Sequence, residues 1–360
     1  MIIKIADNIL SPLGLTTEEN LHAVQAYRSA LQTYQRWNIP EAFMASLFAE
    51  GQLEDYSYEG ALRQSITAAV KQVPLLDLSS SRVCLILSST KGHTTGPEGE
   101  RMGETAAHLA KHFGITTQPV TVSNACISGL AAQILAQRLL ESGKYDTAIV
   151  AGCDIQTKFI VSGFQSFKAV STEECRPFDE DRFGLNLGEA VATIIYTRKE
   201  EVKAEDWVLC KGAIRNDAFH ISGPSKTAEG CYRALHQVMQ GENAEQIACI
   251  SAHGTATLYN DDMESKAIDR EGMNQTLVSG LKGYYGHTMG AAGLLETILT
   301  MHALDEGWVP GTRGFNACGT SRELNVSGEH QPTSLRQFVK LMSGFGGCNA
   351  AALFKKGEEL

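Results

Sequence analysis

Short apolar runs alternate with helical patterns along most of this chain, and no other feature of the sequence constrains its fold as strongly. Val83–Ser89 and Thr147–Gly152 are β-branched or apolar runs of strand length. Tyr58–Lys71 and Gly103–His112 carry apolar residues at helical spacing. Strands that alternate with helices in this way predict an α/β fold. The further predicted strands are Thr121–Ala125, Ala190–Thr197, Val208–Ile214, Ile247–Ser251, Thr276–Gly280, Phe338–Met342 and Ala350–Phe354, and the further predicted helices are Thr227–Met239 and Met289–Asp305.

The chain also resembles itself on the two sides of a charge-rich segment, Arg198–Asp206. In each half, one glycine lies near the start of a helical pattern and a second follows the same number of residues later. The pairs are Gly129 with Gly143 and Gly293 with Gly307. A strand that runs into a glycine turn follows each helix, and each half closes on an apolar strand with a basic end. We predict an ancient duplication, although any two βα units share some of these features.

Composition excludes several classes of function. The 360 residues are 43% hydrophobic and 20% charged, which is ordinary for a globular protein with a large core. The formal net charge is −10 and no basic cluster is present, so a nucleic-acid-binding role is not expected. No apolar stretch reaches the length of a membrane span. The first residues lack the charged region and cleavage site of a signal peptide, so we expect a cytoplasmic location.

The nine cysteines are scattered singly and form no CxxC pair. The ten histidines show no HExxH or similar spacing. Neither a zinc site nor a thioredoxin-like redox motif is therefore predicted. Reduced thiols that pack in the core of a cytosolic protein explain most of these cysteines.

Cys126 follows the predicted strand Thr121–Ala125 and is expected in the first turn of a strongly periodic helix that ends near Gly143. A thiol at a helix N-terminus meets unpaired backbone N–H groups and the positive end of the helix dipole, and both favour the reactive thiolate. Taken alone, however, the segment is better explained by a small buried cysteine without chemistry. Cys126 becomes a candidate nucleophile only together with the histidine motifs that follow it.

Two later motifs each carry a histidine among small residues. His253 comes directly after the predicted strand Ile247–Ser251, in the segment SAHGTAT, where small neighbours allow close approach by a ligand. His287 lies in KGYYGHTMGAAG, which begins at Lys282 and enters a helix rich in glycine and alanine. Glycine is costly inside a helix, so we expect this helix to pack tightly, with the helix after Cys126 as the candidate partner. Tight packing explains the glycines but leaves Lys282 and His287 unexplained.

A third motif, Ser343–Asn349 (SGFGGCN), forms a glycine-rich turn between two predicted strands. Because this turn does not open a helix, it is poorly suited to binding nucleotide phosphates. It suits a loop that presents a backbone N–H group and one mobile aromatic ring, that of Phe345.

Together these motifs resemble those of the β-ketoacyl synthases, the condensing enzymes of fatty-acid and polyketide synthesis in the thiolase-like superfamily. The resemblance runs from the SPLG segment at Ser11 to the C-terminus. It includes a block that begins with PFD at Pro177, although Ala190 stands where the family usually has glycine. The resemblance implies a thiolase-like fold of two pseudo-duplicated βα halves, packed as a layered α-β-α-β-α body. Residues 1–198 would carry the nucleophile and residues 199–360 the two histidines.

The same resemblance implies the chemistry. Cys126 would accept an acyl group from an acyl-carrier-protein thioester, a step for which a cysteine thiolate is a good nucleophile. The backbone N–H groups of Cys126 and Phe345 would form the oxyanion hole, and the Phe345 ring would act as a gate. His253 and His287 would donate N–H bonds to the enolate that forms when a malonyl group loses CO₂.

Lys282 and Glu296 are expected to support the pocket as an ordered pair, and neither a metal nor an organic cofactor is implied. The implied partner is an acyl carrier protein, loaded with either an acyl or a malonyl group. In the resembling family the strand before the nucleophile lies near the subunit interface, so Thr121–Ala125 predicts a homodimer or a heterodimer with a related synthase-like chain. The pathway, whether fatty acid, polyketide or aryl polyene, stays open.

Other functions fit the sequence less well. A non-catalytic partner subunit of the chain-length-factor type typically lacks the nucleophile, whereas this chain has Cys126 and both histidines. Thiolases and starter-unit synthases usually carry a second cysteine or a histidine–asparagine pair in place of the two histidines. A papain-like cysteine protease is disfavoured because its sequence neighbourhood around the cysteine is absent. A β-ketoacyl synthase is therefore the predicted function, with a partner subunit or another thiolase-like acyltransferase as the alternatives.

Overall fold

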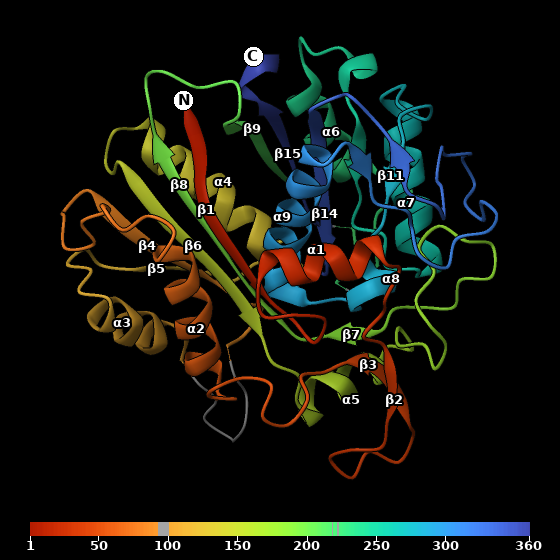
Figure 1. Ribbon diagram of the computed structural model, residues 1–360. Coiled ribbons are helices and arrows are strands. Elements are labelled where there is room, and N and C mark those ends of the chain that lie inside the picture. Colours follow the sequence, from red (N-terminus) through yellow and green to blue (C-terminus); the bar gives the residue numbers. More distant parts are fainter. Residues whose placement is uncertain (93–100, 218, 222) are drawn as a thin grey trace.

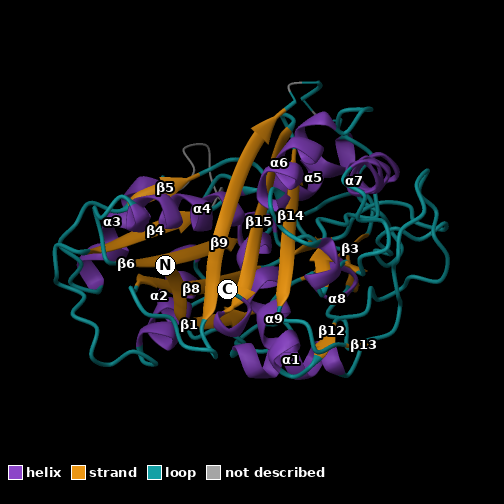
Figure 2. Cartoon of the chain, turned by 90° about the horizontal axis from the view of Figure 1, so that it is seen from above, coloured by secondary structure: helices purple, strands orange, loops and turns teal. Residues whose placement is uncertain are grey.

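The computed structural model describes residues 1–92, 101–217, 219–221 and 223–360. Ten of the strands in these ranges form one large sheet. Its strands in the first half of the chain are β1 (Ile2–Leu10), β4 (Val83–Ser88), β5 (Val120–Val122), β6 (Thr147–Asp154) and β8 (Ala190–Arg198). Those in the second half are β9 (Trp207–Asn216), β10 (Cys249–Ser251), β11 (Val278–Ser279), β14 (Gln337–Gly344) and β15 (Cys348–Lys356). The predicted α/β fold is confirmed (Figures 1 and 2).

The strand order repeats between the two halves of the sheet. Across the sheet the order is β11-β10-β14-β15-β9-β1-β8-β6-β4-β5. In each half the third strand along the chain lies at the free edge, followed by the second, fourth, fifth and first. The directions repeat as well, because β4 is parallel to both β5 and β6 while β10 is parallel to both β11 and β14. Ile3 of β1 pairs with Val208 of β9 where the halves meet. The division at residues 198 and 199 stays a prediction.

The helices complete a layered body. They are α1 (Thr17–Gln25), α2 (Tyr58–Val70), α3 (Met102–His112), α4 (Ser128–Glu141), α5 (Lys158–Ser166), α6 (Glu229–Met239), α7 (Leu258–Arg270), α8 (Lys282–Tyr285) and α9 (Ala292–Asp305). Helices α2 and α3 cover the outer face of the first half-sheet, and α6 and α7 cover that of the second. Helices α4 and α9 lie between the half-sheets and contact both (Figure 1). None of the helices in the described ranges is long and apolar enough to cross a membrane.

The contact between α4 and α9 depends on glycine, as the sequence predicts. A Cβ atom added to Gly129 would lie 2.7 Å from the carbonyl oxygen of Gly290, and one added to Gly293 would lie 2.5 Å from the backbone nitrogen of Leu130. Both distances are too short for real atoms, so only glycine allows the two helices to approach this closely. The approach joins the helix that follows Cys126 to the helix that follows His287.

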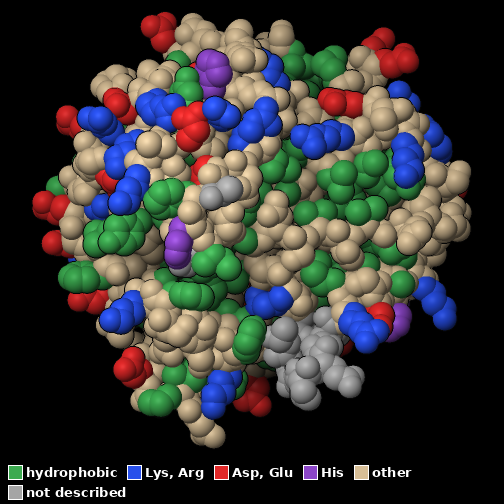
Figure 3. All heavy atoms as spheres, turned by 180° about the vertical axis from the view of Figure 1, so that it is seen from behind, with side chains coloured by type: hydrophobic (Ala, Val, Ile, Leu, Met, Phe, Trp, Pro, Cys, Tyr) green, Lys and Arg blue, Asp and Glu red, His purple; other side chains and the backbone are tan. Residues whose placement is uncertain are grey.

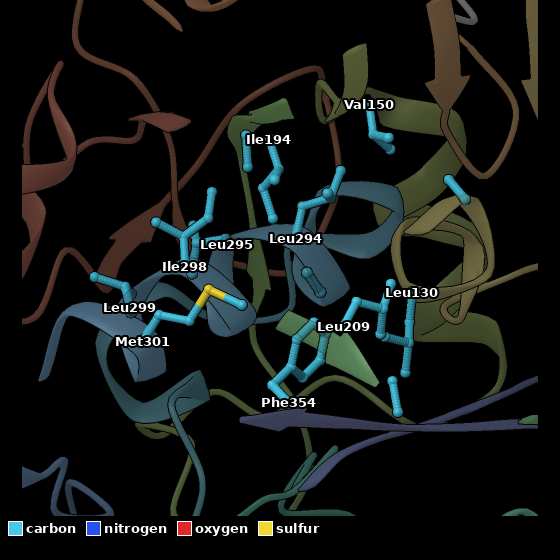
Figure 4. Close-up of a cluster of buried hydrophobic side chains, with 14 of the residues drawn as sticks. Leu130, Val150, Ile194, Leu209, Leu294, Leu295, Ile298, Leu299, Met301 and Phe354 are labelled. Carbon is cyan, nitrogen blue, oxygen red and sulfur yellow. The ribbon is translucent and has the colours of Figure 1, made fainter. Parts of the chain in front are cut away.

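The centre of the core surrounds α9. This helix is buried on nearly every side, as expected for a helix that is apolar all round. Figure 4 shows Leu294, Leu295 and Ile298 among side chains contributed by α4, by both half-sheets and by α9 itself. Helix α9, which follows His287, is therefore held in place by both halves of the chain.

Some elements differ from the sequence-based expectation. Strand β1 and helices α1, α5 and α7 were not predicted, and the predicted strand Thr121–Ala125 is shorter, because β5 ends at Val122. The residues after Val122 turn into the site instead. The smaller elements are the sheet of β2 (Gln32–Tyr34), β3 (Phe43–Ser46) and β7 (Leu187–Gly188), and the pair β12 (Trp308–Val309) and β13 (Gln331–Pro332).

Candidate active site

Cys126 sits on a sharp turn between β5 and α4. The preceding residue, Ala125, has a φ of 45°, in the left-handed region that few non-glycine residues adopt. The hydroxyl of Ser128 holds this turn, because it accepts a bond from the backbone N–H of Asn124 at 2.8 Å and donates one to the carbonyl of Ala125 at 2.6 Å. Helix α4 begins at Ser128 after its cap residue Ile127, so Cys126 lies just before the helix rather than in its first turn. Its side chain is only 6% exposed.

Burial decides the protonation state of Cys126. Removal from water raises the pKa of this thiol to about 12, and the neighbouring Cys348 contributes in the same direction. Lys282, Lys91 and a hydrogen bond from the backbone N–H of Phe345 act in the opposite direction but do not compensate. Burial thus outweighs the groups that favour the thiolate. Cys126 is a thiol at rest and has to lose its proton when it reacts.

The two predicted histidines lie beside Cys126, although they come from separate motifs. The rings of His253 and His287 are 5.0 Å apart between centroids and nearly perpendicular, at 80°. The sulfur of Cys126 and one nitrogen of each ring all lie within 4.8 Å of one another. Burial, followed by the nearby positive charge of Lys282, holds the pKa of both imidazoles well below its ordinary value. Both rings are therefore neutral at physiological pH.

Backbone contacts fix the tautomer of His287. The N–H of Met289 donates to Nδ1 of His287 at 3.3 Å, so a neutral ring carries its proton on Nε2. This Nε2 atom is buried and has no hydrogen-bond partner within the described ranges. A protonated Nε2 is a hydrogen-bond donor and not a metal ligand. The cluster of one cysteine and two histidines is therefore better suited to binding a negatively charged oxygen than to holding a cation.

A buried charge network supports His253 from behind. Lys282 Nζ donates to the carbonyl of His253 and lies 2.7 Å from Oε1 of Glu296. Nζ of a second lysine, Lys340, lies 2.7 Å from the other oxygen of Glu296. Burial alone would raise the pKa of Glu296, but the two lysines hold it below its ordinary value. The backbone N–H of His253 donates to Glu264 at 2.7 Å. Lys282 and Glu296 thus form the predicted pair, whereas Lys340 and Glu264 were missed as site residues.

Phe345 lies at the tip of the β14–β15 hairpin, as predicted for a turn between two strands. Its backbone N–H points at the Cys126 thiol. Its half-buried ring stacks on Phe164 at 5.6 Å and meets the edge of Phe167 at 5.7 Å, both between ring centroids. A Cβ atom added to Gly344 would lie 3.1 Å from the backbone nitrogen of Cys126, which explains a glycine at that position. The loop thus brings the backbone N–H of Phe345 to the sulfur and packs closely against the backbone of Cys126.

A cavity of about 240 Å³ leads to these residues. Cys126, His253 and His287 line its inner end. Exposed aromatic side chains surround its mouth, among them Phe183, which is 73% exposed, and Tyr259, which is 80% exposed. The cavity thus gives access to the thiol past aromatic side chains, and Phe345 is part of its wall.

Comparisons with known proteins agree with this geometry. The family model described as "Beta-ketoacyl synthase, N-terminal domain" matches residues 88–202, and the one described as "Beta-ketoacyl synthase, C-terminal domain" matches residues 208–316. The 3-oxoacyl-[acyl-carrier-protein] synthase 2 of Vibrio cholerae is 30% identical over 270 residues, which cover 70% of this chain and 65% of the relative. That of Mycobacterium tuberculosis is 31% identical over 251 residues, or 65% of this chain and 60% of the relative. The match thus spans less than two thirds of these relatives.

Solved structures with low sequence identity share the whole fold. The ishigamide ketosynthase/chain length factor has a TM-score of 0.88 at 22% identity, with 99% of this chain and 98% of that chain covered. The ketosynthase ApeO in complex with its chain length factor ApeC, from Xenorhabdus doucetiae, has a TM-score of 0.85 at 23% identity and the same coverage. These likenesses confirm the thiolase-like architecture expected from the sequence.

Proposed function

Because the chain belongs to the β-ketoacyl synthase family, we propose that it is a 3-oxoacyl-acyl-carrier-protein synthase that condenses a Cys126-bound acyl group with a malonyl group. One observation carries the proposal, namely that the Cys126 sulfur and a nitrogen of each of His253 and His287 lie within 4.8 Å of one another. A non-catalytic partner subunit has no need of such a cluster at the end of a cavity.

The first half-reaction loads the acyl group. The Cys126 thiol attacks the carrier thioester, its proton passes to the departing carrier thiolate, and the acyl group remains on the Cys126 sulfur. The oxygen of the tetrahedral intermediate becomes negatively charged, and the N–H groups of Cys126 and Phe345 are the proposed donors to it. Loss of one such donor typically raises the barrier by about 3 kcal/mol.

The second half-reaction forms the carbon–carbon bond. The malonyl thioester loses CO₂, and the electron pair of the broken bond forms an enolate whose oxygen needs hydrogen-bond donors. The partnerless Nε2–H of His287 and the ring of His253 supply them. The enolate carbon then attacks the acyl carbonyl, and the Cys126 thiolate leaves. Neutral imidazoles suit this role because they donate a bond without first having to bind a proton.

An acyl carrier protein and a second synthase-like subunit are the proposed partners. Solved relatives include a type II acyl-carrier protein in complex with its ketosynthase and a ketosynthase in complex with its chain length factor. Strand β5 forms the free edge of the sheet, and partly exposed apolar side chains, Val122 and Leu135 among them, lie on β5 and α4. Hydrophobic side chains also gather on the rear face of the molecule (Figure 3). A homodimer or heterodimer through β5, a cytoplasmic location and the pathway stay predictions.

Intact-mass spectrometry after incubation with acyl-carrier-protein thioesters tests the function. We expect a single acyl adduct, located on the Cys126 peptide, and no adduct on a Cys126→Ala variant. Cys84 is a buried free thiol far along the chain from the motif, so Cys84→Ala is a matched control that keeps the adduct. An adduct that persists in Cys126→Ala would overturn the mechanism.

A further inference from the structure

We propose that Lys340 is a positioning residue for decarboxylation, which holds the chain that carries His253 and places a second fixed positive charge behind the two histidines. This inference rests on the proposed function. Lys282 and Lys340 are the lysines with no exposed surface among the residues that the structure describes. Lys340 was not predicted as a site residue from the sequence, because it is a single charged residue between apolar neighbours in strand β14.

Lys340 Nζ donates to three backbone carbonyls, one on its own strand (Leu341, 3.0 Å) and two in the segment before His253. Its Nζ donates to the carbonyls of Ser251 at 2.9 Å and Ala252 at 3.1 Å, while Lys282 donates to the next carbonyl, that of His253 itself. Lys340 also pairs directly with Ser251 across the parallel strands β14 and β10. Two ammonium groups therefore hold three consecutive carbonyls, and the position of the His253 ring depends on both.

Stability does not explain a lysine at this position. The neighbouring side chains on β14, those of Val339, Leu341 and Met342, are fully buried and apolar. A buried ion pair is often no more stable than apolar residues of similar size that replace both partners, so the core does not by itself require charged groups here. A positive charge here has a different consequence. Glu296 is one carboxylate between two lysines. Lys282, Lys340 and Glu296 together therefore carry a net positive charge, close to where the enolate forms.

Several charged groups surround Lys340 and act on its ammonium group. Glu296 of α9 binds it directly, Lys282 of α8 opposes its charge, and Glu264 of α7 lies close enough to act on it. Lys340 in turn helps to keep the imidazoles of His253 and His287 neutral, after burial and Lys282. Its removal is therefore expected to change both the position and the proton affinity of His253.

Lys340→Met tests the inference in the full-length protein, with Lys4→Met as the matched control. Lys4 is a partly buried lysine paired with Asp7, and it does not line the cavity. Wild type is assayed first for acyl transfer to Cys126 and for decarboxylation of malonyl-acyl-carrier protein. In Lys340→Met we expect at least a tenfold lower kcat for decarboxylation, with the acylation rate and the KM for the malonyl carrier within threefold of wild type. Lys4→Met should leave all three unchanged.

A second readout separates positioning from simple loss of structure. In NMR spectra of ¹³C-histidine-labelled protein, the pKa of His253 should rise in Lys340→Met and stay constant in Lys4→Met, because a nearby cation has been removed. If Lys340→Met does not fold, Glu296→Gln is compared with Glu296→Gln/Lys340→Met, in which the second change should still lower decarboxylation at least fivefold. Equal loss of both half-reactions, or no loss, overturns the inference. A wild-type protein that performs neither step refutes the proposed function instead.

Discussion

The close approach of α4 and α9 predicts that Gly293→Ala destabilises the protein, although alanine favours helix more than glycine. A Cβ atom at this position would lie 2.5 Å from the nitrogen of Leu130 and 3.1 Å from its Cβ. The nearest atom belongs to the backbone of a buried helix, so it cannot move aside as a flexible side chain would. Overpacking of this kind typically costs about 1–3 kcal/mol, against a propensity gain of about 1 kcal/mol. We expect a net loss of up to about 2 kcal/mol in the free energy of unfolding.

Gly163 supplies the matched control. It lies within helix α5, and an added Cβ would meet no atom within 4 Å. Gly163→Ala should therefore gain about 0.5–1 kcal/mol from propensity alone. Urea unfolding followed by circular dichroism measures both variants. Since α9 also follows His287, the Gly293→Ala variant should lose condensing activity even where it is folded. A Gly293→Ala variant as stable as Gly163→Ala would show that the two helices do not need this glycine.

Three further predictions concern the site. His253→Ala and His287→Ala should each lower malonyl decarboxylation far more than acylation of Cys126, which quench-flow assays of the two steps resolve; equal losses would count against separate roles. The ring of Phe345 should leave its stacked position when Cys126 is acylated, and an unchanged ring in crystal structures of both states would remove the gate. Burial raises the pKa of Glu264 from its ordinary value of 4.5 to about 7 in the folded protein. The protonated carboxyl therefore contributes fully to folding stability below pH 4.5, and this contribution is lost as the pH rises through 7. Glu264→Gln should lack this loss, up to about 3 kcal/mol between pH 5 and 8 in chemical unfolding, and an identical pH dependence in both proteins would contradict it.

Much of the fold was predictable because its strands are short apolar runs bounded by turns. β4, β6, β8 and β15 lie within a few residues of their predicted bounds. Helix α7 was missed because its sequence is strongly polar, even though its buried face packs under the second half-sheet. Periodicity reports how apolar residues are spaced along one segment, and it fails where polar side chains are buried by contacts with distant parts of the chain.

Some residues of the site could also be predicted from the sequence, and others could not. Cys126, His253 and His287 were found because each lies in a segment of small residues that is unusual for its position, and the structure brings the three together. Lys340 and Glu264 were not found, because a single charged residue in an ordinary strand or helix carries no local signal. Their burial is a property of the packed layers around α9, where strand β14 and helix α7 converge behind His253.

The same burial also sets the resting protonation states of the Cys126 thiol and the two imidazoles. Low polarity favours neutral forms, so Cys126 stays a thiol and both imidazoles stay uncharged. The charged groups lie behind His253 instead. They are Lys282 and Lys340, whose positive charge is only partly balanced by Glu296. Negative charge that develops on a substrate oxygen therefore meets N–H donors in front and positive charge behind. Such an arrangement stabilises the anion more than the neutral substrate, and this difference is what lowers the barrier to decarboxylation.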